Sequence, residues 1–282
     1  MLPATFTLGG DLTVSRLGFG AGRIVGGGYW GPPADRDAAL AVLRHAVDHG
    51  VTLIDTADNY GPDISEELIS AALHPYPADL VVATKGGVVR TGPDLWHHAG
   101  RPEQLRPACE ASLRRLRLEA VPLYQLHRVD PAVPLADQLG TLLELQREGK
   151  IRHIGLDTVT TEQLRDGLKL APIASVQNHY NLHHRMGDDV LELCDDHSIA
   201  FLPYLPLCGG ALTSSDHGDL GTIAEAHHAT PGQIALAWLL HRSPTLLPTP
   251  GTTTLKHLAE NLAAAHVTLT NDDMRMLDTL AG

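Results

Sequence analysis

The apolar residues of this 282-residue chain switch repeatedly between a spacing of two and a spacing of 3.6. Short apolar runs of strand type alternate with longer amphipathic segments of helix type, which is the order that produces a parallel sheet. Eight such units follow one another without a linker, and eight uninterrupted units favour a closed barrel over an open doubly wound sheet. We therefore predict an α/β fold, a (β/α)8 TIM barrel forming one domain over residues 1–282.

The predicted elements can be placed by residue number. An N-terminal β-hairpin spans 5–8 and 12–14. The eight strands are expected at 16–20, 53–54, 80–84, 122–126, 151–156, 174–177, 200–203 and 246–247. The helices are expected at 35–49, from 65, at 102–116, at 134–148, from 160, at 188–197, from 231 and at 255–265, with an extra C-terminal helix at 271–280. Thr160 and Gln163 form a capping box at one helix start, and Trp238 is predicted to lie in the core.

Composition excludes several classes of partner and site. The net charge of -12 comes without a lysine-rich or arginine-rich run, which argues against nucleic acid or an anionic membrane as partner. The three cysteines lack the spacing of a disulfide framework or a zinc site, and Gly26-Gly27-Gly28 lacks the spacing of a dinucleotide-binding turn. With no leader-like N-terminus and no apolar run of about 18 residues, we expect an unprocessed cytoplasmic protein.

Four residues suited to proton transfer stand next to predicted strands: Asp55, Tyr60, Lys85 and His127. A phenol is a poor acid, with an ordinary pKa of about 10. A nearby ammonium such as Lys85 would lower the pKa of Tyr60, and a carboxylate such as Asp55 would keep the lysine charged. His127 would orient a substrate carbonyl or relay a proton. Each residue alone also fits a solvated charge, but the set predicts a proton-donating site.

The barrel prediction brings these four residues together. All strand C-termini of a (β/α)8 barrel open on one face. Asp55, Lys85 and His127 directly follow the second, third and fourth predicted strands. Tyr60 lies in the loop after Asp55, where the turn at Gly61-Pro62 would fold it back over the barrel mouth. We therefore expect one shared pocket.

Six segments in order give the chain a family resemblance. They are IDTADNYG, VVATKGG, LYQLHRVD, GKIRHIGL, SVQNHYNL and PTPGTTTLKHLAENLAA. Together they resemble the successive signatures of the aldo-keto reductases, especially the bacterial, pyridoxal-reductase-like members. The resemblance implies an NADPH-dependent oxidoreductase that reduces an aldehyde or ketone to an alcohol, with NADH less favoured. It also implies that Tyr60 is the general acid, that Lys85 and Asp55 tune it, and that His127 positions the carbonyl oxygen, while the cofactor carries the hydride.

The same resemblance implies the cofactor contacts. Gln177 would bind the nicotinamide amide, Tyr204 would stack on its ring, and backbone amides at 252–255 would hold a phosphate at a helix start. The complete implied set is Gly20, Ala21, Asp157, Thr158, Gln177, Tyr204, Pro206, Leu207, Gly251, Thr252, His257, Glu260 and Asn261.

Two departures from the family pattern bear on the cofactor. Asp157-Thr158 stands where the family has serine followed by asparagine or glutamate, and an ionised Asp157 can only accept hydrogen bonds. One hypothesis is that Asp157 keeps the carboxamide contact and favours the oxidised cofactor. The alternative is that it pairs with a neighbouring cation or amide and weakens binding generally. The second departure is Gly251 and His257, where many members place a lysine and an arginine for the 2′-phosphate.

Aromatic residues at Tyr29, Trp30 and Trp96 would wall a substrate pocket, although loop packing fits them equally. Two other functions stay open. A regulatory barrel that binds cofactor without turnover is the main alternative, and the intact set of four residues speaks against it. A metal-dependent hydrolase is suggested by the 17 histidines, but side chains of adjacent histidines face different ways and are poor chelators. A small-molecule carbonyl is the expected partner, with the oligomeric state left open.

Overall fold

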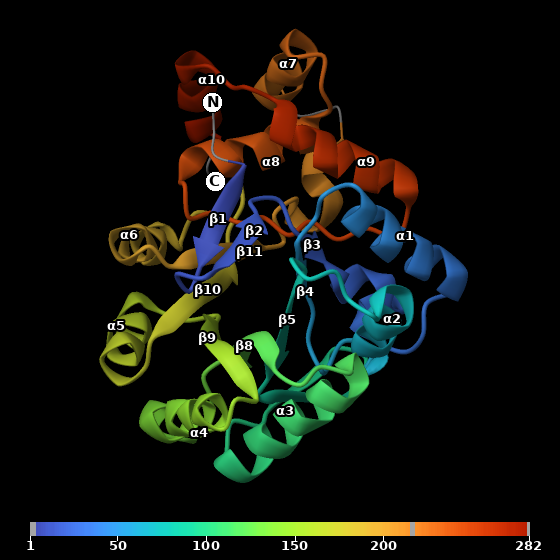
Figure 1. Cartoon of the computed structure of the whole chain (residues 1–282). Helices are drawn as coiled ribbons and strands as arrows, with labels where there is room; N and C mark the ends of the chain where they lie inside the picture. The colour runs from blue at the N-terminus through green and yellow to red at the C-terminus, as the bar shows by residue number, and fades with distance from the viewer. Residues whose placement is uncertain (1–3, 215–217, 281–282) are drawn as a thin grey trace.

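A ring of parallel strands forms the centre of the computed structural model, which describes residues 4–214 and 218–280 (Figure 1). Seven neighbouring strands pair in the order in which they occur along the chain. They are β3 (Phe19–Gly20), β4 (Leu53–Asp55), β5 (Val81–Gly86), β8 (Val121–His127), β9 (Ile151–Asp157), β10 (Ile173–His179) and β11 (Ala200–Tyr204). Every neighbouring pair is parallel. All seven strand C-termini therefore face the same end of the molecule.

The segment 245–248 closes this sheet into a barrel. Phe201 of β11 donates to the Thr245 carbonyl at 2.9 Å and accepts from the Leu247 amide at 2.8 Å. On the other side, the Gly18 amide donates to the Pro248 carbonyl at 3.0 Å. The predicted eighth strand is thus present as a short bridge between β11 and β3. The predicted TIM-barrel fold is confirmed.

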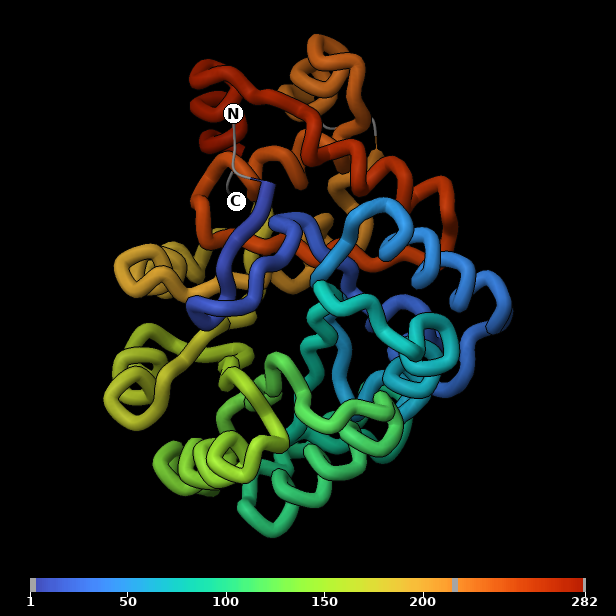
Figure 2. The backbone as a smooth tube through the Cα atoms, viewed as in Figure 1, coloured from blue at the N-terminus to red at the C-terminus, as the bar shows by residue number. Residues whose placement is uncertain are grey.

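Helices surround the strands, and most are amphipathic, with one buried apolar stripe. They are α1 (Arg36–Asp48), α2 (Ile64–Leu73), α3 (Pro102–Leu116), α4 (Leu135–Arg147), α5 (Thr161–Leu170), α6 (Asp188–His197), α7 (Gly218–Ala226), α8 (Pro231–Arg242), α9 (Leu255–Ala263) and α10 (Asn271–Asp278). The Thr160–Gln163 capping box forms as predicted. Trp238 is fully buried. The backbone tube shows α1, near the start of the chain, beside α9, near its end (Figure 2).

The N-terminal hairpin closes one end of the barrel. It consists of β1 (Thr5–Leu8) and β2 (Leu12–Ser15), which pair antiparallel as expected. Leu8 and Val14 are fully buried in one cluster with Leu53, Val81 and Leu123, which lie at or near the starts of their strands. The hairpin therefore seals the end of the barrel where the strands begin. The hairpin leaves the opposite end, where the strands terminate, uncovered.

The structure corrects several predicted boundaries. The first strand is only β3, and Lys85 lies inside β5 rather than beyond it. A second hairpin, β6 (Val88–Gly92) and β7 (Leu95–His98), was expected to be loop. Its strands are short, and three of the four β7 residues are exposed, so it lacks the apolar run that marks a buried strand. Helix α7 also escaped prediction.

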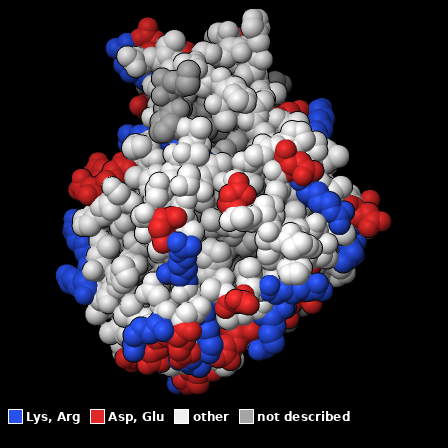
Figure 3. Space-filling model, viewed as in Figure 1, with Lys and Arg blue, Asp and Glu red and all other residues white. Residues whose placement is uncertain are grey.

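Charged side chains of both signs are intermixed along the outer edge of the face shown in Figure 3, and much of its middle is uncharged. No helix in the described part of the chain combines the length and apolar character needed to cross a membrane.

Candidate active site

The four predicted proton-transfer residues meet at the open end of the barrel. Asp55 is the last residue of β4 and His127 the last residue of β8, while Lys85 lies near the end of β5. Tyr60 follows in the loop between β4 and α2, and its amide donates to the Ala57 carbonyl at 3.2 Å. The parallel strands thus carry residues far apart in sequence to one place.

A buried ion pair lies at the base of the site. Lys85 Nζ donates to Asp55 Oδ2 at 2.7 Å and to the Thr56 carbonyl at 2.8 Å, and the lysine side chain is fully buried. Burial opposes the Lys85 charge, but Asp55, together with Tyr60 and Asp157, more than offsets it, so the pKa of Lys85 lies above its usual value. Gln125 Nε2 donates to the other oxygen of Asp55 at 2.9 Å. Sequence reasoning missed Gln125, whose only signal is a polar residue inside an apolar strand.

Tyr60 lies half-buried above this pair and lines the cavity described below. Lys85 Nζ lies 5.1 Å from the centre of its ring. Burial raises the pKa of Tyr60 above its usual value, and the charge of Lys85 only partly opposes that effect. The lysine therefore acts in the expected direction, but the expected net lowering of the pKa is not found. The phenol is fully protonated at neutral pH and so holds a proton ready for transfer.

His127 faces Tyr60 and Asp157. Its ring is nearly perpendicular to that of Tyr60, with 6.1 Å between ring centres. Burial, together with the charges of Lys85 and Arg128, holds the pKa of His127 well below its usual value. The imidazole is therefore neutral and carries its proton on one nitrogen only.

Asp157 forms no hydrogen-bonded pair with a cation among the described residues. Its nearest basic atom is His127 Nε2, 3.8 Å from Oδ2, and Thr158 Oγ1 donates to Oδ1 at 2.6 Å. Burial raises the pKa of Asp157 to about 6, against the opposing charge of Lys85. The carboxyl group thus changes its charge close to neutral pH.

Aromatic rings stand beside the four residues. Tyr29 lies 5.5 Å from Tyr60, and Trp96 lies 6.1 Å from His127, between ring centres. The hairpin β6–β7 carries both Trp96 and Arg90, and the Arg90 guanidinium packs between Trp30 and Trp96. The unpredicted hairpin therefore brings Trp96 to the site, and its Arg90 contacts Trp30. Arg90 escaped prediction because its segment was expected to be loop.

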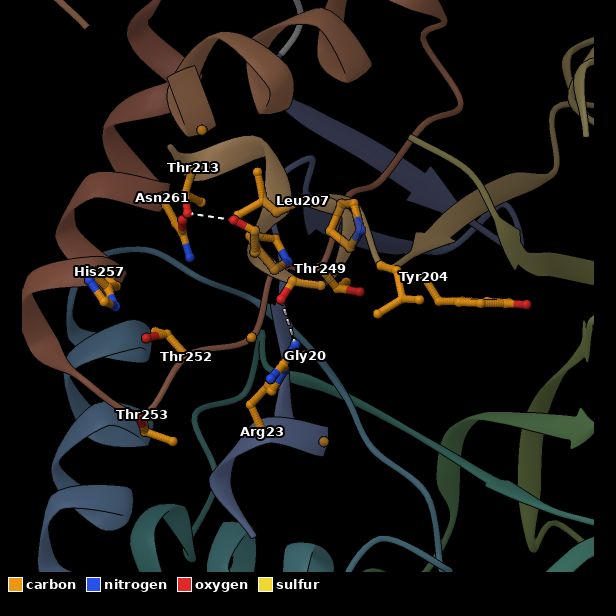
Figure 4. Close-up of a pocket in the computed structure, with 18 of the residues that line it drawn as sticks. Gly20, Arg23, Tyr204, Leu207, Thr213, Thr249, Thr252, Thr253, His257 and Asn261 are labelled. Carbon is orange, nitrogen blue, oxygen red and sulfur yellow. Dashed lines mark hydrogen bonds between the residues drawn. The ribbon is translucent and has the colours of Figure 1, made fainter. Parts of the chain in front are cut away.

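A cavity of about 810 Å³ begins at Asp55 and Tyr60 and extends toward α9. Figure 4 shows Thr252, Thr253, His257 and Asn261 together at one end and Tyr204 at the other. Most of the predicted cofactor contacts line it, namely Gly20, Gln177, Tyr204, Pro206, Leu207, Gly251, Thr252, His257, Glu260 and Asn261. Ala21, Asp157 and Thr158 lie outside this lining. Their predicted cofactor contacts therefore find no direct support in the cavity.

The cavity has features that suit a dinucleotide. Gln177 Nε2 is buried without a hydrogen-bond partner, and such a group normally has one. At the other end, Thr254 caps the start of α9, whose first turn carries backbone amides that suit a phosphate. Lys256 and His257 add basic groups there.

Comparison with known proteins decides the family. The sequence profile described as the Aldo/keto reductase family matches residues 16–281. The chain belongs to the aldo/keto reductase family. It is accordingly an NAD(P)H-dependent oxidoreductase, and the family resemblance seen in its motifs is confirmed.

Relatives of this reductase match it over almost its full length. It is similar to an uncharacterized oxidoreductase of Schizosaccharomyces pombe, 44% identical over 95% of this chain and 87% of the relative. It is also similar to pyridoxine 4-dehydrogenase of Escherichia coli, 40% identical over 98% of each chain. An aldo-keto reductase from Klebsiella pneumoniae in complex with NADPH has a TM-score of 0.85 and 30% identity, covering 99% of this chain and 95% of that one.

Family membership removes the metal-hydrolase alternative. In the described residues, no group of three or more histidine, cysteine or acidic side chains is arranged to hold a metal ion.

One of the adjacent histidines of the sequence, His184, makes a ring contact beside the cavity. His184 stacks on His179, with 3.9 Å between ring centres, and His179 stacks in turn on Tyr204 at 5.2 Å. One face of the Tyr204 ring is thus backed by imidazole.

Proposed function

We propose that this reductase uses NADPH to reduce an aldehyde or ketone to an alcohol, with Tyr60 as the general acid. The observation that carries the proposal is the position of Tyr60, which lies above the buried Lys85–Asp55 pair and lines the large cavity. The known cofactor of a similar structure supports NADPH, since the Klebsiella pneumoniae reductase is a complex with it.

Each residue has one part in the proposed reaction. Bound NADPH supplies the hydride that reaches the carbonyl carbon. As the carbonyl oxygen gains negative charge, Tyr60 gives it the phenolic proton, which completes the alcohol and leaves a phenolate. Lys85 stabilises that phenolate, because its ammonium lies under the tyrosine ring and Asp55 keeps it charged. Neutral His127 donates a hydrogen bond to the same oxygen and so fixes its position.

The cavity supplies the proposed contacts to NADPH. The unpartnered Gln177 amide would bind the nicotinamide carboxamide, and the free face of Tyr204 would stack on the ring. The start of α9 would bind phosphate, while Glu260 and Asn261 would contact the adenine. Tyr29, Trp30 and Trp96 would hold the substrate beside His127.

The proposal is tested by following oxidation of NADPH by absorbance with a panel of aldehydes and ketones. Turnover of at least one carbonyl compound, with the matching alcohol as product, is expected. Binding of NADPH without any turnover would instead favour the regulatory-barrel alternative.

The cofactor preference has its own prediction. We expect NADPH to give a higher kcat/KM than NADH, and His257→Leu to lower it roughly tenfold for NADPH only, because a charge-assisted hydrogen bond contributes about 1.5–3 kcal/mol. Steady-state kinetics with both cofactors measures this, and His266→Leu is the control, since His266 does not line the cavity. An equal loss with NADH would show that His257 does not contact the 2′-phosphate.

Asp157 gives a prediction that depends on pH. We propose that its carboxylate favours the positively charged oxidised ring, so Asp157→Ser should lower the preference for NADP+ over NADPH by roughly fivefold. Because the pKa of Asp157 is about 6, the carboxylate is charged above that pH and neutral below it. The preference of the unmodified protein should therefore fade as the pH falls through 6. Titrations of both cofactors on each side of pH 6 test this, with Asp130→Asn as control, and an unchanged ratio would disprove it.

A further inference from the structure

One buried amide joins His127 to the hairpin that carries Trp96. Asn59 stands next to Tyr60 in the loop after β4, and only 3% of its surface is exposed. Its Nδ2 atom donates to the Val88 carbonyl of β6 at 2.9 Å and lies 3.1 Å from His127 Nδ1. The two hydrogens of the Asn59 side-chain nitrogen therefore contact two parts of the site, strand β6 and the His127 ring.

The Val88 contact fixes which way the amide faces. A backbone carbonyl can only accept a hydrogen bond, so the nitrogen of Asn59 must be the atom beside it. The same nitrogen is then the atom beside His127, where it can only donate. His127 Nδ1 must therefore be an unprotonated acceptor, and the single proton of the neutral ring must lie on Nε2.

The opposite edge of the His127 ring faces the reaction. Nε2 makes no hydrogen bond within the described residues, and its nearest acidic neighbour, Asp157 Oδ2, is 3.8 Å away. Its Nε2–H group is thus free for a ligand oxygen. The Oδ1 atom of Asn59 is buried without a partner, a cost that proteins rarely accept without reason. Both observations indicate that Asn59 is held for its donor atom.

We infer that Asn59 is a positioning residue that sets the Nε2–H tautomer of His127, so that His127 can donate to the carbonyl oxygen of the substrate. The inference rests on the proposed function, in which that oxygen receives the proton of Tyr60. Through Val88, Asn59 also sets the position of β6 relative to His127 and therefore that of the aromatic wall.

The test compares Asn59→Asp and Asn59→Leu with the unmodified protein. Aspartate presents only acceptors, so it pulls the proton to Nδ1, favours the charged imidazolium and raises the pKa of His127. We expect kcat to fall roughly 10²–10⁴-fold, the upper end being the loss when a positioned histidine is held in the wrong tautomer, and a new ionisation to appear in its pH profile. Asn59→Leu removes the preference for the Nε2–H tautomer of His127, so kcat should fall while KM changes little.

The tautomer is read directly by NMR of protein labelled with 15N-histidine, with and without NADP+. His127→Gln identifies the His127 signals by their disappearance. The unmodified protein should show a protonated Nε2 and an unprotonated Nδ1, whereas Asn59→Asp should show a protonated Nδ1. Gln138→Leu is the matched control, because it removes another buried amide that holds a loop but does not touch His127. It should lower Tm and leave the His127 signals unchanged.

Two results would overturn the inference: a proton on His127 Nδ1 in the unmodified protein, or an unchanged pH profile and unchanged His127 signals in Asn59→Asp. The first needs no variant to fold. Failure of the proposed function looks different. Full turnover by Tyr60→Phe would show that Tyr60 is not the general acid, while the tautomer of His127 seen by NMR would stay the same.

Discussion

Replacing Tyr60 with phenylalanine is expected to lower kcat by roughly 10²–10⁴-fold, the usual effect of removing a general acid. The change removes one oxygen and keeps the ring that packs against Tyr29. The affinity for NADPH should therefore stay nearly constant. Steady-state kinetics with an aldehyde that the unmodified protein reduces gives kcat. Fluorescence titration gives the affinity for NADPH.

Tyr124 offers the matched control for this prediction. It lies in β8, and its hydroxyl group is buried without a hydrogen-bond partner. Tyr124→Phe thus makes the same chemical change away from the cavity and should leave kcat unchanged. Turnover that survives in Tyr60→Phe would contradict the proposed role of Tyr60.

Replacing Lys85 with methionine is expected to reduce both activity and stability. The side chain is fully buried beside Asp55, and removing one partner of a buried pair leaves an uncompensated charge, at a cost of about 3–5 kcal/mol. Activity should fall because the phenolate of Tyr60 loses its neighbouring cation. Urea unfolding gives the free energy of unfolding, and single-turnover kinetics gives the rate of the chemical step.

A double variant separates the two effects of Lys85. Lys85→Met combined with Asp55→Asn removes both charges, so it should recover much of the lost stability but none of the lost activity.

The contribution of Lys85 to the free energy of unfolding should depend on pH with a definite sign. Since the pKa of Lys85 is raised, its contribution to stability is complete below the ordinary lysine pKa of about 10.4 and is lost only as the pH rises through the higher value. A stability difference that varied around neutral pH would point to another group.

The parts of the site that follow from strand position could be predicted from the sequence. Asp55, Lys85 and His127 sit at or near strand ends, and parallel strands in a barrel must bring such residues to one face. The cavity lining includes most residues implied by the family motifs. The placing of Asp55, Lys85 and His127 needed only the order and type of the elements, whereas the cavity residues came from the family resemblance.

The parts that depend on side-chain contacts could not be predicted. Gln125 and Asn59 are polar residues with no spacing signal, and their partners Asp55 and His127 are brought to them only by the fold. The raised pKa of Tyr60 reflects the loss of water around its phenol in the assembled site, which outweighs the nearby ammonium. Burial is a property of the assembled site. Residue type alone therefore indicated only the smaller effect on the Tyr60 pKa, the charge of Lys85, and not the larger effect of desolvation.

The seam of the barrel sets an order of assembly. Gly18 and Pro248 meet there although most of the chain separates them, so the seam cannot form until synthesis has reached residue 248. During synthesis, a chain that stops before residue 245 has β3 and β11 as open edges. The walls of the cavity are likewise drawn from both ends of the chain, Gly20 from one and Asn261 from the other. The cavity proposed to hold the dinucleotide is therefore complete only in a finished and closed barrel.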